Sequence, residues 1–139
     1  MSLTLVARKS IRASPERLFE LWTTPEHLHR WWGPKDVTCV GAEVDLRVGG
    51  RYRLGNRFPD GKVVWISGEF EEIRRPSQLC YSWRVEGTDG APERVTVRFE
   101  PEDGATLVIV THERIADEAL RRGHAAGWEG CLDGLERYA

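Results

Sequence analysis

The most constraining feature of the sequence is a stretch of short apolar segments, residues 37–114, that turn-forming residues interrupt at five places. Apolar and polar residues alternate there with a period close to two, which is typical of strands with one buried face. The interruptions are Gly49-Gly50, Pro59-Asp60-Gly61, Pro76, Thr88 to Pro92, and Asp103-Gly104. Five short turns predict six neighbouring antiparallel strands. We expect Gly49 and Gly50 to close a tight hairpin of the primed type, because that turn needs positive φ.

The residues before this meander predict one strand followed by two short helices. The segment from Leu3 to Ile11 is rich in Thr, Val and Leu, as strands are. Ser14-Pro15 and Thr24-Pro25 are both helix-start pairs, because the hydroxyl can cap the helix and the proline needs no amide donor. Gly33-Pro34 ends the second helix.

The C-terminal segment predicts a long amphipathic helix, with Asp117 as its N-cap. Its apolar positions recur at intervals of three or four residues: Leu120, His124, Trp128, Cys131, Leu135 and Tyr138. Four glycines lie beside this stripe, and each costs about 1 kcal/mol relative to alanine in a helix: Gly123, Gly127, Gly130 and Gly134. Such a helix needs tertiary packing. The glycines either let the backbone approach the sheet closely, which we favour, or leave volume for a ligand.

Composition limits the chain to one domain, residues 1–139, with 20 Lys and Arg against 22 Asp and Glu. A chain of this size can build a full core without metals or disulfides. The near-neutral charge argues against a nucleic-acid partner, and no apolar run is long enough to span a membrane. Three cysteines, 41 and 51 residues apart, form neither a metal-binding pair nor a regular disulfide framework, so we expect reduced thiols and a cytoplasmic location.

One strand, two short helices, six strands and a long helix indicate an α+β fold. Several motifs in this order resemble the homologues of the activator of heat shock protein 90 ATPase, in the START-like superfamily. They are Leu21 to His27, Trp31 to Pro34, Asp45 to Gly50, Pro59 to Gly61, Gly68 to Ile73 with Pro76, Tyr81 to Trp83, Thr111 to Arg114, and Gly127-Trp128 with Leu132 and Leu135.

The resemblance implies the helix-grip fold of the birch pollen allergen. In that fold a seven-stranded antiparallel sheet wraps around a long C-terminal helix and encloses a cavity that commonly admits lipids, polyketides or other apolar molecules. The superfamily also contains cyclases and cochaperone domains, and fold alone does not decide among such functions. We therefore expect an apolar or aromatic small molecule as partner. A cyclase, aromatase or hydrolase-like enzyme and a chaperone-binding module remain alternatives, and a homodimer is left open.

Eight residues are candidates for the wall of this cavity, because aromatic rings offer apolar area and a few polar groups can orient a ligand. They are Trp31, Trp65, Tyr81, Trp83, His112, His124, Gly127 and Trp128. Taken singly, Trp65, Tyr81, Trp83 and Trp128 are more often expected to fill the core, and a lone interior histidine is more often structural. Trp31 and Trp32 are adjacent in a helix and point about 100° apart, so we expect at most one of them to face fully inward.

We identify no catalytic residue, although an enzyme of this fold could use His112, His124 or Glu113 for proton transfer. The direction of His112 stays open because both faces of its strand are apolar. His27 and His29 are two residues apart on a helix and point to different faces, which suits one metal ion poorly. We expect no metal and no cofactor.

Overall fold

The computed structural model describes residues 1–139, which form seven strands and three helices. In chain order they are β1 (Leu3–Ile11), α1 (Pro15–Thr23), α2 (Pro25–Trp31), β2 (Thr38–Val44), β3 (Arg51–Arg57), β4 (Val63–Arg74), β5 (Gln78–Val85), β6 (Glu93–Glu102), β7 (Ala105–Ile115) and α3 (Glu118–Tyr138). The strands form one antiparallel sheet in the order β1-β7-β6-β5-β4-β3-β2. The predicted six-strand meander with an added N-terminal strand is confirmed. None of the helices combines the length and hydropathy that a membrane span requires.

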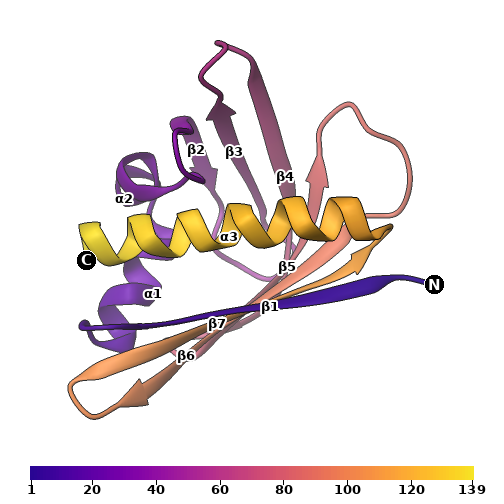
Figure 1. The fold of residues 1–139 in the computed structure, drawn as a ribbon. Helices are drawn as coiled ribbons and strands as arrows, with labels where there is room; N and C mark the ends of the chain where they lie inside the picture. Colours follow the sequence, from indigo (N-terminus) through magenta and orange to yellow (C-terminus); the bar gives the residue numbers. More distant parts are fainter.

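Helix α3 lies across the sheet, with α1 and α2 beside its C-terminal end (Figure 1). Asp117 caps it as predicted, since its carboxylate accepts a hydrogen bond of 2.9 Å from the Leu120 amide. At the opposite end, Lys9 of β1 contacts Asp133 with an N–O distance of 3.0 Å. The buried face of α3 consists of Trp128, Cys131, Leu132 and Leu135. This is the expected helix-grip arrangement.

The connection between β2 and β3 is not the tight hairpin that the sequence predicts. Residues 45–50 separate the two strands. Within them, the Gly49 amide donates to the Phe70 carbonyl at 2.8 Å, and the Phe70 amide donates to the Gly50 carbonyl at 2.9 Å. The two glycines therefore pair with β4 instead of closing a two-residue turn. A Cβ on Gly50 would lie 2.1 Å from the Asp45 carbonyl oxygen, so the need for glycine there is close backbone approach.

The expectation that only one of Trp31 and Trp32 faces inward is also wrong, since both are 4% exposed. Trp32 is the C-cap of α2 and has extended backbone angles (φ −66°, ψ 137°), so the angular spacing of helical residues does not apply to it. Each indole N–H finds a buried acceptor. Trp31 donates to the Leu21 carbonyl at 2.8 Å, and Trp32 donates to Asn56 Oδ1 at 3.0 Å.

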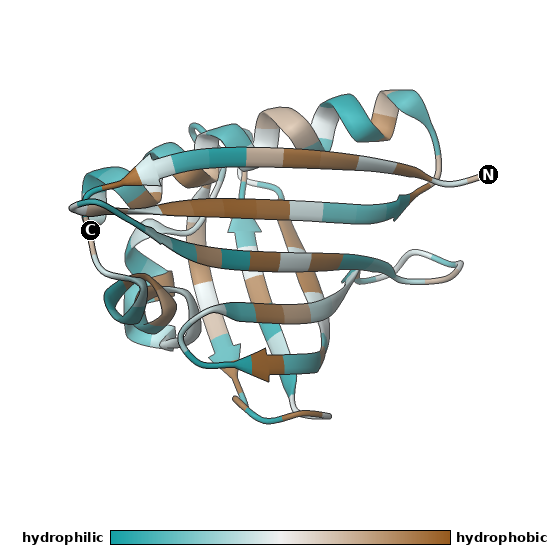
Figure 2. Cartoon of the chain, turned by 90° about the horizontal axis from the view of Figure 1, so that it is seen from below, coloured by the Kyte–Doolittle hydropathy of each residue, from teal (hydrophilic) through white to brown (hydrophobic).

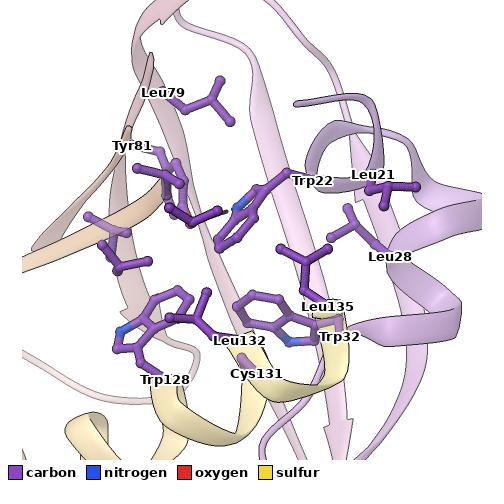
Figure 3. Packing of buried hydrophobic residues seen from close by; sticks show 14 of the residues in the cluster. Leu21, Trp22, Leu28, Trp32, Leu79, Tyr81, Trp128, Cys131, Leu132 and Leu135 are labelled. Carbon is purple, nitrogen blue, oxygen red and sulfur yellow. Dashed lines mark hydrogen bonds between the residues drawn. The ribbon is translucent and has the colours of Figure 1, made fainter. Parts of the chain in front are cut away.

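Hydrophobic and hydrophilic segments alternate along several strands (Figure 2), and the hydrophobic positions meet α1, α2 and α3 in a cluster of 27 buried residues. Indole rings fill the part of this core beside α1 and α2. Trp22 stacks on Trp128 with a centroid distance of 6.1 Å, and its N–H donates to the Tyr81 hydroxyl at 3.3 Å (Figure 3). The interior near the short helices is thus occupied by side chains.

Candidate functional site: a groove beside helix α3

A groove of about 530 Å³ lies between α3, the loop of residues 34–37 and strands β3, β4 and β5. Ten of its 18 lining residues are hydrophobic. Three indole rings contribute to its wall, those of Trp32, Trp83 and Trp128. Its volume falls within the range of about 300–1,000 Å³ that is usual for small-molecule sites. The groove is therefore large enough and apolar enough to receive an organic ligand.

The glycine stripe of α3 serves both purposes that the sequence analysis left open. Gly123 and Gly127 line the groove, and a Cβ at Gly123 would meet no heavy atom within 4 Å. At Gly130, by contrast, a Cβ would lie 2.6 Å from the Lys35 backbone nitrogen, and at Gly134 it would lie 3.0 Å from the Trp31 carbonyl oxygen. The first two glycines thus leave volume, and the last two allow the backbone to pack closely.

Four of the eight candidate residues line the groove: Trp83, His124, Gly127 and Trp128. Trp65 does not. It lies on the opposite face of β4 from Val64 and Ile66, which do line the groove, because neighbouring strand residues point to opposite faces. Its ring covers Gly41 and Gly55, and the guanidinium of Arg53 lies 3.9 Å from the ring centroid. The Trp65 ring therefore packs on the outer face of the sheet and does not contribute to the groove.

The other three candidates lie outside the groove. Trp31 borders a separate, more polar depression of about 830 Å³ on the other side of the loop of residues 34–37. Tyr81 is buried in the core, where burial raises the pKa of its hydroxyl, so it stays protonated. His112 is fully buried behind the groove wall, with its ring centroid 5.2 Å from that of Trp83.

His112 belongs to a hydrogen-bonded chain that reaches the groove. The Trp128 indole N–H donates to His112 Nδ1 at 2.9 Å, and His112 Nε2 lies 2.6 Å from Glu93 Oε1. The same carboxylate oxygen lies 2.9 Å from Nε2 of His124. Because an indole nitrogen can only donate, His112 Nδ1 must accept, and the proton of its neutral ring is on Nε2. The chain therefore runs from Trp128 through His112 to a carboxylate that His124 shares.

The electrostatics of this hydrogen-bonded network keep the carboxylate of Glu93 ionised. Burial opposes ionisation of Glu93, but hydrogen bonds from the two histidines outweigh it and lower its pKa to about 2. Burial lowers the pKa of His112, and Glu93 opposes that shift only in part. The result at neutral pH is an ionised Glu93 beside a neutral His112.

Glu93, His112 and His124 place three potential metal-ligand atoms within 4.8 Å of one another. A histidine that binds a metal through Nε2 must carry its proton on Nδ1. In His112, however, Nδ1 accepts a hydrogen bond from the indole N–H of Trp128. Because an indole nitrogen can only donate, this Nδ1 does not carry a proton. The donor set therefore suits a hydrogen-bonded network better than a metal, and the expected absence of a metal stays a prediction.

Among the polar groups of the site, the sequence analysis missed Asn56, which lines the groove, and Glu93, which lies behind it. A signal for Glu93 exists, since it shares the inward face of β6 with three buried residues, Val95, Val97 and Phe99. A charged residue on the same strand face as buried apolar residues suggests that its charge is paired with a polar group in the interior. The carboxylate that was named instead, Glu113, lies on a different face, where it contacts Arg94 at 3.9 Å.

The comparisons with known proteins agree with this architecture. An AHSA1 protein from Silicibacter pomeroyi has a similar structure, with a TM-score of 0.86, 24% sequence identity and coverage of 97% of this chain and 96% of that one. A protein from Chromobacterium violaceum gives a TM-score of 0.86 at 23% identity, covering 96% of this chain and 94% of that one. An AHSA1-like protein from Aeromonas hydrophila gives 0.80 at 27% identity, covering 98% and 91%.

No curated protein matches the sequence. A family model does match it, over residues 12–139, which includes every element except β1. This agrees with the resemblance seen in the motifs. The chain belongs to the family described as Activator of Hsp90 ATPase homolog 1-like protein.

Proposed function

We propose that this protein binds a small apolar or aromatic molecule in the groove between α3 and strands β3 to β5. The observation that carries the proposal is the groove itself, about 530 Å³ in volume and walled by three indole rings. Its family commonly binds hydrophobic ligands, which is in keeping with such a site. A ligand that buries about 300 Å² of apolar surface gains about 7 kcal/mol before the cost of association.

Two side chains of the groove wall, Trp83 and Asn56, each have a nitrogen without a hydrogen-bond partner in the protein. Trp83 is 7% exposed, and its Nε1 is a buried side-chain nitrogen that makes no hydrogen bond. Asn56 uses its Oδ1 to accept from Trp32, so its amide nitrogen stays free to donate. An acceptor on a ligand can pair with the Asn56 amide nitrogen, whereas Trp83 Nε1 is closed off in this structure and would be reached only after a shift of the groove wall.

A substitution that fills the groove tests the proposal. Gly127→Leu would place a side chain into it from α3, while Ala119→Leu adds a side chain of the same kind to an exposed position of that helix. We expect N-phenylnaphthylamine, an apolar fluorescent probe, to bind the wild type and Ala119→Leu equally and Gly127→Leu at least tenfold more weakly. Circular dichroism checks that both variants are folded. Equal binding to all three proteins would contradict the assignment of the groove.

A further inference from the structure

The groove contains one hydrogen-bond acceptor whose identity the surrounding contacts fix. His124 lines the groove, and its Nε2 is 2.9 Å from Glu93 Oε1. Because an ionised carboxylate only accepts hydrogen bonds, Nε2 must carry the proton of the neutral imidazole. The lone pair of the neutral ring is then on Nδ1. This atom makes no hydrogen bond within the protein and is not among the buried unpaired atoms, so it is open to a ligand.

Neighbouring groups hold the imidazole in this orientation. The ring of His124 stacks on that of His112, with a centroid distance of 4.4 Å and an angle of 16° between their planes. Glu93 cannot turn away from His124 without also losing its hydrogen bond with His112. Trp128 donates to Nδ1 of His112, which keeps the proton of that ring on Nε2, the nitrogen that faces the carboxylate. The acceptor is therefore preorganised, which reduces the entropy lost when a ligand binds to it.

The charge of the network strengthens this acceptor. An ionised carboxylate that accepts a hydrogen bond from one imidazole nitrogen increases the electron density of the ring, which makes the other nitrogen a better hydrogen-bond acceptor. Hydrogen bonds of this kind are strongest with donors that are themselves acidic. Beside indole walls, the donor that fits best is a hydroxyl group on an aromatic or conjugated ring.

We propose that the ligands of this groove carry a phenol-type or enol-type hydroxyl group, and that this group donates its hydrogen bond to Nδ1 of His124. Glu93 is the positioning residue, because it acts on the ligand only through His124. This inference rests on the proposed function, since it names the chemical class of molecule that the same groove takes.

A matched pair of ligands tests it. Naphthol and its methyl ether, methoxynaphthalene, share one apolar ring system, but only naphthol has an O–H to donate. We expect the wild type to bind naphthol about threefold to tenfold more tightly than methoxynaphthalene, which corresponds to the contribution of one hydrogen bond. His124→Phe keeps the stacked ring and removes Nδ1, so it should bind the two ligands equally.

Three further results separate the possible explanations. Val64→Ala, which alters the groove wall but no member of the hydrogen-bonded network of Glu93, His112 and His124, should weaken the binding of both ligands and keep the ratio of their affinities. Glu93→Gln keeps the shape and loses the charge, so it should reduce the ratio, and it carries the test if His124→Phe fails to fold. A wild-type preference that survives in both His124→Phe and Glu93→Gln overturns this inference alone. If neither ligand binds the wild type, the proposed function fails with it.

Discussion

Two alanine substitutions on one helix should change stability in opposite directions. Gly123 and Gly130 both lie inside α3, seven residues apart in the sequence. Replacement of a helical glycine by alanine reduces the freedom of the unfolded chain and is worth about 1 kcal/mol when the new methyl group has room. Gly123 has that room, because no heavy atom lies within 4 Å of the position of its Cβ. We expect Gly123→Ala to stabilise the protein by about 1 kcal/mol.

Gly130 lacks that room. Its Cβ would lie 2.6 Å from the Lys35 backbone nitrogen and 3.1 Å from the Pro34 Cα, and backbone atoms cannot move aside as the end of a flexible side chain can. Overpacking of this kind typically costs about 1–3 kcal/mol, which exceeds the helical gain at the upper end and cancels it at the lower end. We expect Gly130→Ala to destabilise the protein by about 1 kcal/mol, which places the two variants about 2 kcal/mol apart.

Urea unfolding followed by circular dichroism measures this difference, because a change of midpoint at constant slope is a change of stability. The wild type should lie between the two variants. If Gly130→Ala is as stable as Gly123→Ala, the loop of residues 34–37 yields freely, and our account of close packing at this end of α3 is wrong.

Two other predictions follow from the titrating groups. The folded-state pKa of Glu93, about 2, lies below its ordinary value of 4.5, so its ionised form stabilises the fold above pH 4.5 and this contribution is lost as the pH falls toward 2. The stability difference between the wild type and Glu93→Gln should therefore shrink across that range, and a constant difference in urea unfolding would contradict it. Burial raises the pKa of Cys131 to about 12, so a thiol reagent should modify the half-buried Cys80 first and reach Cys131 only after unfolding, as mass spectrometry of the modified protein can show.

Much of the fold could be predicted because its signals are local. Ser14 and Asp117 cap their helices as expected, and the turn residues divide the strands where the structure divides them, apart from the Gly49-Gly50 connection. A cap, a turn or an alternating strand depends on residues a few positions apart, which sequence displays directly. The family resemblance then supplied the expectation that the sheet wraps around the last helix.

The candidate site was predicted only in part, because residues from distant segments decide it. Trp65 and Trp83 look alike in sequence, yet they lie on opposite faces of the sheet because of the strand register. Gly123 and Gly130 belong to one stripe, but only the second meets the loop of residues 34–37. Their roles depend on what lies opposite them.

The sequence alone determined the order of the elements, the long amphipathic helix and the family of this chain. The tertiary structure decided where the groove lies and which polar groups reach it, since β6, β7 and α3 must pack before Glu93, His112 and His124 can meet. The physical reason is one of range: backbone preferences act between neighbours, whereas hydrogen-bonded networks and cavities are made by side chains that only the folded chain brings together.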